Sequence, residues 1–177
     1  DKLILPGVGT AVAAMKNLNE RGLVPLIRAA KQPLLGFCLG MQMLAQASEE
    51  TMSGSDGSDE GLIEGLGIVP GRIRLMEVGN LRLPHMGWNQ IEHDETHPLL
   101  RGIRSGSYFY FVHSYAAQTD PATVMVPGPT DLPRTTWAHH GVDFVAAVEN
   151  GPLSATQFHP EKSGAAGAQL LRHWLLS

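Results

Sequence analysis

The chain of 177 residues is poor in the features that mark several large classes of protein: it has one cysteine, no run of basic residues and no membrane-length apolar stretch. A single cysteine excludes an internal disulfide framework and is typical of the reducing cytoplasm, where we expect this protein to work. A net charge of −4 without a basic run gives no sign of nucleic-acid or membrane binding. No cysteine and histidine residues have zinc-site spacing, so neither a metal nor another cofactor is expected.

The lone cysteine, Cys38, stands between two glycines, Gly36 and Gly40. An apolar run over residues 33–37 precedes it and a helix-like run over 41–47 follows it. This is the pattern of a nucleophile elbow, in which a strand turns sharply into a helix and the glycines leave room for the crowded backbone. The N-terminus of the helix is expected to favour the thiolate, which is the reactive form of the side chain.

A histidine with a carboxylate two positions on, His159 and Glu161, can supply the base that thiol chemistry needs. A lone cysteine is more often a small buried apolar residue than a nucleophile. Any one of the eight histidines is likewise more often structural than catalytic. Here the elbow glycines, Gln42 and the His-x-Glu pair occur together, and this combination favours catalysis.

Together these residues resemble the class I, triad-type glutamine amidotransferases, through Gly-x-Cys-x-Gly-x-Gln at 36–42 and His-Pro-Glu at 159–161. The resemblance covers nearly the whole chain and narrows to the glutaminase subunits of imidazole glycerol phosphate synthases. Further segments that carry it are Pro-Gly-Val-Gly at 6–9, Pro-His-Met-Gly-Trp-Asn at 84–89, Phe-Val-His-Ser-Tyr at 111–115 and Ala-Thr-Gln-Phe-His-Pro-Glu-Lys-Ser at 155–163. Each motif is only suggestive by itself, but five in this order are specific.

The resemblance implies hydrolysis of the glutamine side-chain amide by a triad of Cys38, His159 and Glu161. The tetrahedral intermediate of such a reaction needs two N–H donors. One is expected from Leu39, directly after the nucleophile, and the other from Val8. An ordinary tight turn is the alternative reading of the glycines that flank Val8, and the resemblance favours the oxyanion role.

Other residues are expected to meet the amino-acid end of glutamine or to line its path. The resemblance assigns this role to the side chain of Gln42 and to backbone groups of Ser114 and Tyr115. It also assigns Gly7 and Gly9 to the substrate-binding strand. The alternatives are a solvated helix residue for Gln42 and core packing for Tyr115.

The resemblance also implies a partner, a (β/α)₈-barrel cyclase subunit that forms a heterodimer with the glutaminase. In that family the cyclase uses ammonia to make imidazole glycerol phosphate and an aminoimidazole carboxamide ribotide in histidine biosynthesis. Trp88, Asn89 and Lys162 are the expected contact residues, with burial of Trp88 and solvation of Lys162 as alternatives. Two other functions stay open: a glutaminase of GMP, anthranilate or pyridoxal phosphate synthesis, and a non-catalytic subunit of the same fold.

Helical patterns cluster early and late in the chain, with short strand patterns between them. This order predicts one α/β domain over residues 1–177, a three-layer sandwich with a central mixed sheet, as in flavodoxin-like proteins. Strands are expected at 2–5, 33–37, 67–70, 71–75, 90–92, 108–112, 123–126, 144–148 and 153–157. Helices are expected from a Thr10 cap through Leu18 and over 22–30, 39–49 and 167–176.

Two loops are expected, an acidic one at 50–60 and a proline-rich one at 127–141, where Trp137 is expected to pack locally. The chain begins with Asp1, and its first strand starts abruptly. From the resemblance we also expect that the chain lacks an N-terminal strand and helix of the family.

Overall fold

A computed structural model describes residues 1–50, 61–118 and 134–177. Its largest sheet is mixed and has five strands in the order β1-β2-β11-β10-β9. The first three run parallel, whereas β10 is antiparallel to both β11 and β9. These strands are β1 (Leu3–Leu5), β2 (Leu34–Phe37), β11 (Leu153–Thr156), β10 (Asp143–Asn150) and β9 (Arg134–His139).

Two smaller sheets flank this central one. A four-stranded sheet has the order β4-β3-β5-β8, and a two-stranded antiparallel ribbon pairs β6 with β7. The strands of the first are β4 (Ile63–Glu64), β3 (Ala45–Ser48), β5 (Val69–Leu75) and β8 (Tyr115–Ala117). The ribbon consists of β6 (His85–Gln90) and β7 (Tyr108–His113).

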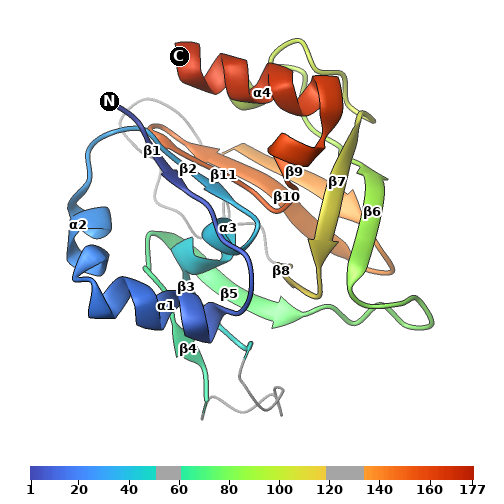
Figure 1. Cartoon of the computed structure of the whole chain (residues 1–177). Helices are drawn as coiled ribbons and strands as arrows, with labels where there is room; N and C mark the ends of the chain where they lie inside the picture. The colour runs from blue at the N-terminus through green and yellow to red at the C-terminus, as the bar shows by residue number, and fades with distance from the viewer. Residues whose placement is uncertain (51–60, 119–133) are drawn as a thin grey trace.

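Helices cover both faces of the central sheet (Figure 1). On one face lie α1 (Ala11–Glu20), α2 (Leu23–Ala29) and α3 (Leu39–Leu44). On the other lie α4 (Gly164–Leu176) and the short 3₁₀ turns η1 (Pro98–Leu100) and η3 (Pro160–Lys162). Among the described residues no helix is long and apolar enough to cross a membrane.

The central sheet divides the apolar interior into two clusters, as a three-layer sandwich requires. Along β10, Phe144 and Ala146 pack with α4 and the ribbon, whereas Val145 faces the cluster around α1 and α3. The pairing with β9 shifts register between Val145 and Ala147, so Ala146 and Ala147 both face the α4 side. Such a bulge adds one residue to the strand and reverses its alternation beyond that point.

The three parallel strands end at one edge of the central sheet, and the predicted functional segments follow them there. Gly7 comes two residues after β1, Cys38 directly after β2, and His159 three residues after β11. Ligand sites of α/β sheets lie at the carboxyl ends of such strands. The central mixed sheet, its helical layers and this placement confirm the predicted fold class.

The predicted elbow helix over 39–49 is too long. The helix ends at Leu44, and Ala45 has extended backbone angles of −64° and 167°. From there the chain forms β3, which pairs in parallel with β5 and antiparallel with β4. Pairing between strands distant in sequence therefore overrides the helical preference of residues 45–49, which a local pattern cannot reveal.

Several strand predictions also need correction. The predicted strands at 67–70 and 71–75 form one strand, β5, and the strand predicted at 90–92 lies earlier, as β6. Residues 134–139, which we assigned to the proline-rich loop, form β9, because a sheet partner in β10 is available to them. Trp137 does pack locally, against the cluster around α1 and α3. The strand predicted at 123–126 and nearly all of the acidic loop lie outside the described residues.

Candidate active site

Cys38 occupies the strained turn between β2 and α3. Its φ is 49° and its ψ is −108°, and it is the only non-glycine residue with positive φ in the described part of the chain. The Cys38 N–H donates to the Thr156 carbonyl of β11 at 2.7 Å, and its own carbonyl accepts from the Gln42 N–H at 3.1 Å. These two bonds hold the turn from the sheet on one side and from the helix on the other, as the elbow pattern predicts.

The elbow glycines are required by space. A Cβ atom at Gly40 would overlap the Leu5 carbonyl of β1, and one at Gly36 would lie 3.0 Å from the carbonyl carbon of Gly40. The helix that follows the nucleophile therefore packs directly on the backbone of the central sheet. This confirms the reason inferred from the sequence for the glycines on either side of Cys38.

The Cys38 thiol is neutral in this resting arrangement. Its sulfur lies 3.7 Å from two partners: its S–H donates to the Val112 carbonyl, and it accepts from Gln157 Nε2. Burial raises the pKa of the Cys38 thiol from 9.0 to about 11, although the Leu39 N–H opposes this shift. The prediction that the elbow favours the thiolate was therefore wrong, because desolvation outweighs the N–H groups at the start of a six-residue helix.

His159 is oriented by a carboxylate, and its ring faces Cys38. Its Nδ1 lies 2.7 Å from Glu161 Oε1. A carboxylate accepts the Nδ1 proton, which leaves the lone pair on Nε2. Nε2 is buried and forms no hydrogen bond within the described residues. The His159 N–H donates to the Tyr110 carbonyl at 2.9 Å, which fixes this turn to β7.

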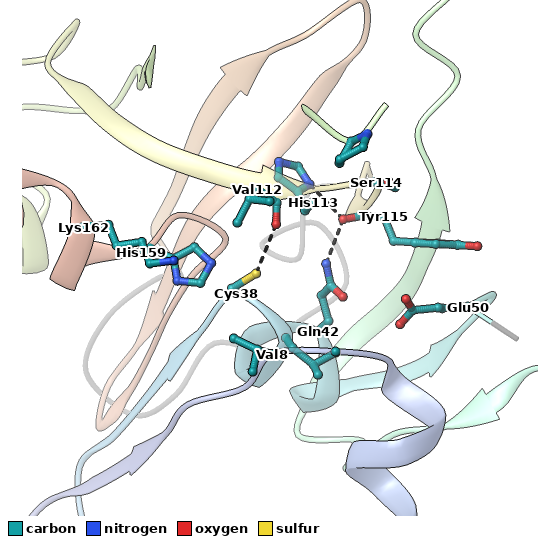
Figure 2. A pocket seen from close by; sticks show the side chains of 13 residues that line it. Val8, Cys38, Gln42, Glu50, Val112, His113, Ser114, Tyr115, His159 and Lys162 are labelled. Atoms are coloured by element: carbon teal, nitrogen blue, oxygen red, sulfur yellow. Dashed lines mark hydrogen bonds between the residues drawn. The ribbon is translucent and has the colours of Figure 1, made fainter. Parts of the chain in front are cut away.

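A cavity of about 310 Å³ joins these groups, and its size suits a small ligand. Cys38 and His159 line it from the two parallel strands β2 and β11, and Figure 2 shows the two side chains facing each other across one end. The other lining residues are Val8, Gly9, Leu39, Gln42, Glu50, Pro84, Val112, His113, Ser114, Tyr115 and Lys162. The cavity therefore brings together most of the predicted triad, oxyanion and substrate residues. Glu161 lies behind His159, outside the lining.

The proposed oxyanion strand borders this cavity. Val8 is 84% exposed and lines the cavity with Gly9. Gly9 has a φ of 96°, a conformation that side chains disfavour, whereas Gly7 is required because a Cβ there would lie 2.9 Å from Leu39 Cβ. The segment therefore packs against the start of α3 at Gly7 and is exposed at Val8.

Gln42 and the segment after β7 meet at the far end of the cavity. Gln42 Nε2 donates to the Tyr115 carbonyl at 2.8 Å and to Gln157 Oε1 at 3.1 Å. The Tyr115 carbonyl also lies 2.9 Å from His113 Nδ1, and the Ser114 carbonyl accepts from the Met76 N–H. Both lone pairs of the Tyr115 carbonyl are therefore occupied within the protein. This carbonyl is not a free acceptor for a substrate.

The comparisons with known proteins agree with this geometry. The family model of class I glutamine amidotransferases matches residues 1–177. The chain belongs to this family. It is 46% identical over 175 residues to the imidazole glycerol phosphate synthase subunit HisH of Vibrio cholerae, covering 99% of this chain and 79% of the relative. Identity to the same subunit of Photobacterium profundum is 48% over 177 residues, covering 99% and 78%.

Solved structures support the amidotransferase fold at lower identity. One glutamine amidotransferase shares 17% identity with a TM-score of 0.61, covering 98% of this chain and 78% of the other. Another, from Thermotoga maritima, shares 18% with a TM-score of 0.55, covering 98% and 60%. At these identities the likeness concerns the fold alone.

Sequence analysis did not single out one acidic residue of this cavity, Glu50. Its carboxylate lines the cavity, and its Oε2 accepts from the Ala11 N–H at 2.7 Å at the start of α1. Glu49 and Glu50 both raise the pKa of the Tyr115 hydroxyl, after the larger effect of its burial. Two carboxylates therefore lie near this end of the cavity, of which Glu49 is paired with Arg74 and Glu50 lines the cavity. We assigned Glu50 to the acidic loop because nothing in the local pattern separates it from the acidic residues that follow.

The three predicted contact residues of the amidotransferase differ in their surroundings. Trp88 is 55% exposed on β6, and its ring meets Tyr110 edge-on at 6.0 Å. Lys162 is exposed beside the cavity, with Nζ 5.9 Å from the centre of the same tyrosine ring. Asn89 is partly buried, and its Nδ2 donates to the His139 carbonyl at 2.8 Å. The alternative of burial for Trp88 is therefore wrong, whereas the exposed Lys162 fits both a contact role and solvation.

Proposed function

We propose that this chain is the glutaminase subunit of an imidazole glycerol phosphate synthase and hydrolyses glutamine to glutamate and ammonia. The observation that carries the proposal is a buried cysteine and an oriented histidine at one end of a cavity whose other end holds the Glu50 carboxylate. The names of relatives 46–48% identical over 99% of the chain support the specific synthase. A catalytic thiol must stay reduced, which supports the cytoplasm as the place of reaction.

The reaction is an acyl transfer in two halves. In the first, His159 Nε2 takes the Cys38 proton as the sulfur attacks the amide carbon of glutamine. The C–N bond then breaks, His159 returns the proton to nitrogen, and ammonia leaves a γ-glutamyl thioester. In the second, water gives a proton to His159 and attacks the thioester. The C–S bond breaks, Cys38 is reprotonated, and glutamate is released.

Glu161 acts through His159. Its hydrogen bond to Nδ1 keeps the lone pair of Nε2 on the side of the cavity and stabilises the imidazolium that forms in each half-reaction. The proton acceptor must come from this pair because the thiol itself is neutral at rest. General-base removal of the proton during the attack is therefore the mechanism that the resting geometry favours.

The negative oxygen of the intermediate is placed between two backbone donors. The Leu39 N–H already points to the Cys38 sulfur closely enough to lower its pKa against the effect of burial. Val8 supplies the second N–H in the proposal, by a rotation that the flanking glycines permit. One such donor is worth about 3 kcal/mol in acyl-transfer sites, or roughly a hundredfold in rate.

The opposite end of the cavity is suited to the charged amino-acid end of glutamine. The Glu50 carboxylate is the candidate partner of the substrate ammonium group. The proposed partners of the substrate carboxylate are N–H groups of the segment at Ser114 and Tyr115, since the Tyr115 carbonyl is already occupied. Gln42 holds that carbonyl in place, so its role is to position the segment rather than to bind by its amide nitrogen.

The outer face of the β6–β7 ribbon is the proposed contact surface for the barrel-shaped cyclase. Side chains alternate along the two strands, so that the large exposed ones gather on this face: Met86, Trp88 and Tyr108, with the partly exposed Tyr110 and Val112. An exposed cluster that contains Trp and Tyr is typical of an interface. Val112 and Lys162 also line the cavity, so a partner on this face would receive ammonia without its passage through water.

The two alternative functions make different demands. A non-catalytic subunit would have no need of Cys38 and His159 lining one cavity with Glu161 hydrogen-bonded to the histidine, and all three are present. Glutaminases of other syntheses share the fold, and structures of such proteins at 17–18% identity do not separate the classes. The specific proposal therefore depends on the nearer relatives and is tested by which synthase the chain activates.

The test is a coupled assay with the (β/α)₈-barrel cyclase and its nucleotide substrate. We expect glutamate release to be slow for the chain alone and strongly accelerated by the partner with nucleotide bound. Cys38→Ala should abolish glutamine-dependent synthesis and leave synthesis from added ammonium intact. Equal loss with both nitrogen sources would contradict a purely glutaminase role, and activation by a different synthase would support the first alternative.

A further inference from the structure

Two buried histidines, one at the end of β7 and one at the start of β6, lie in contact beside the cavity. His113, which ends β7 and lines the cavity, has its Nε2 3.0 Å from Nδ1 of His85, the first residue of β6. His85 Nε2 lies 3.2 Å from Asn89 Nδ2. Both rings are buried among Phe111, Phe144 and each other. The triad does not use either of them.

The groups at the two ends of this series of hydrogen bonds, the Tyr115 carbonyl and the Asn89 side-chain amide, determine which ring nitrogen donates in each bond. At the cavity end, the Tyr115 carbonyl can only accept, so His113 Nδ1 must carry the proton and His113 Nε2 must accept. At the other end, Asn89 Oδ1 accepts from the Gln90 N–H at 2.8 Å and Nδ2 donates to the His139 carbonyl. These backbone partners orient the Asn89 amide, so its Nδ2 is also the donor to His85.

Both histidines must therefore be neutral and carry their proton on Nδ1. His85 donates from Nδ1 to His113 and accepts at Nε2 from Asn89. Burial lowers the pKa of His85 to about 4 and that of His113 to about 3, which agrees with neutral rings. The ring of His140 stacks on His85 at 4.3 Å, and its charge would oppose protonation further.

This chain of bonds continues to the nucleophile. The Tyr115 carbonyl that accepts from His113 also accepts from Gln42, Gln42 donates to Gln157, and Gln157 donates to the Cys38 sulfur. A change at His85 therefore reaches the cavity through one carbonyl whose two lone pairs are shared by His113 and Gln42. Asn89, at the other end, belongs to the strand that also presents Trp88 to the solvent.

We infer that His113 and His85 are positioning residues for glutamine. With both protons on Nδ1, the two rings form a hydrogen-bonded relay that holds the Tyr115 carbonyl and Gln42 in place. The relay also links them to Asn89 on β6. The part of this inference that concerns glutamine rests on the proposed function. The protonation order does not, because it follows from the hydrogen-bond partners alone.

The protonation order is tested by ¹⁵N NMR of the histidine rings in the wild-type chain at neutral pH. We expect the rings of both His85 and His113 to carry the proton on Nδ1, as the His159 ring does through Glu161, and His85→Gln and His113→Gln variants assign the two signals. Neutral imidazole in water favours the Nε2 proton, so this signature is distinctive. A ring of either residue with its proton on Nε2, or a charged ring, would overturn the relay.

The effect on the cavity is tested with a matched pair at the centre of the relay. His85→Gln keeps one donor and one acceptor, whereas His85→Leu keeps neither. In a Cys38→Ala background, which cannot turn over, we expect His85→Leu to raise the Kd of glutamine roughly 3- to 10-fold and His85→Gln to change it less than about 2-fold. The side-chain amide signal of Gln42 should shift in the leucine variant and stay close to its wild-type position in the glutamine variant.

A second pair separates the relay from the surface of β6. Asn89→Asp removes the donor that faces His85 Nε2, so it should move the His85 proton to Nε2 or charge the ring. Gln90→Glu, the same change one residue further on, should leave both rings as they are. Unchanged rings in Asn89→Asp, or equal glutamine affinity in both His85 variants, would refute the relay. A wild-type chain that shows the expected tautomers but binds no glutamine would instead refute the proposed function and remove the positioning role with it.

Discussion

The neutral resting state of Cys38 leads to a prediction that alkylation can test. Burial raises the pKa of this thiol from 9.0 to about 11. We therefore expect the rate of its reaction with iodoacetamide to keep rising with pH and to reach no plateau below about pH 10. Only the thiolate reacts, so a pKa two units higher lowers the reactive fraction about 100-fold at pH 7.5. A more basic thiolate is a better nucleophile, and a Brønsted slope near 0.4–0.5 recovers roughly 6- to 10-fold of this loss. The net effect is a rate about ten times lower than that of an unperturbed thiol, before steric access is considered.

The shape of the pH profile separates ionisation from access. Limited access to a side chain that is only 8% exposed lowers the rate equally at every pH, whereas ionisation sets the slope. We expect the logarithm of the rate to rise by about one per pH unit from 7 to 10. Cys38 is the only cysteine, so mass spectrometry reports this site alone and Cys38→Ser provides the blank. N-acetylcysteine measured alongside gives the unperturbed profile.

The neighbouring charges supply an internal check on the same assay. Glu161 raises and Lys162 lowers the pKa of Cys38, after the larger effects of burial and the Leu39 N–H. Lys162→Met should therefore slow alkylation at pH 7.5, and Glu161→Gln should accelerate it, each by less than about tenfold because Glu161 and Lys162 are exposed. A plateau with an apparent pKa below 8 in the wild-type chain would refute the reasoning. It would mean that a thiolate–imidazolium pair with His159 already exists at rest.

Three further predictions follow from individual contacts. Gly40→Ala should lower the free energy of unfolding by about 3 kcal/mol or more, because the new Cβ would overlap the Leu5 carbonyl of β1, which cannot rotate away. Calorimetry should then show a melting temperature lower by roughly 6–12 °C. Glu161→Ala should keep roughly 10- to 100-fold more partner-activated turnover than His159→Ala, because the backbone hydrogen bond to Tyr110 still holds the histidine. The reverse ranking in one coupled assay would remove the carboxylate from its supporting role. Acid should destabilise the fold through His97, whose burial lowers its pKa from 6.5 to about 4 and outweighs the Glu149 carboxylate 3.6 Å away. As the pH falls, the unfolded chain takes up the proton first. The full free energy of unfolding is therefore present above pH 6.5, and about 3 kcal/mol of it is lost as the pH falls to 4. In urea unfolding, the free energy of His97→Leu should fall by about 3 kcal/mol less over this pH range.

The parts of the site that the sequence predicted are those whose requirements are local. An elbow needs glycines within two residues of the nucleophile, and Gly36 and Gly40 are placed where any side chain would meet backbone. The base and its carboxylate are two residues apart, so His159 and Glu161 can be recognised together. The parallel arrangement of β1, β2 and β11 then brings these short motifs to one edge of the sheet, which the order of strands in the sequence also indicated.

The errors share a different cause, since each depends on a partner distant in sequence. Residues 45–48 form a strand because β5 and β4 lie beside them, although their own composition suits a helix. The prolines at 127, 129 and 133 led us to extend a loop over Thr135, Thr136 and Trp137, which are β-branched and aromatic residues typical of a strand. Strand preference at these three positions was a usable signal that the neighbouring prolines obscured.

The electrostatics of the site were the least predictable part. A helix N-terminus is visible in the sequence and favours a thiolate, but the burial that opposes it comes from segments distant in sequence, such as β7, whose Val112 carbonyl lies 3.7 Å from the sulfur. Glu50 likewise becomes a cavity residue only because β3 carries it back to the start of α1. Whether a titratable group is charged depends on solvation by segments that its own neighbourhood in the sequence does not contain.

Two facts explain why the proposed triad need not be active at rest: the thiol is neutral, and His159 Nε2 has no hydrogen-bond partner among the described residues. His159 is oriented by Glu161, and the Cys38 proton is donated to Val112 instead. Attack requires the thiol to exchange this carbonyl for the histidine while a second N–H joins that of Leu39 at the oxyanion. Val112 belongs to β7, whose outer face is the proposed docking surface, and the exposed Val8 borders the same cavity. A partner that contacts either segment differently in the two arrangements would therefore control the rate without touching the triad itself.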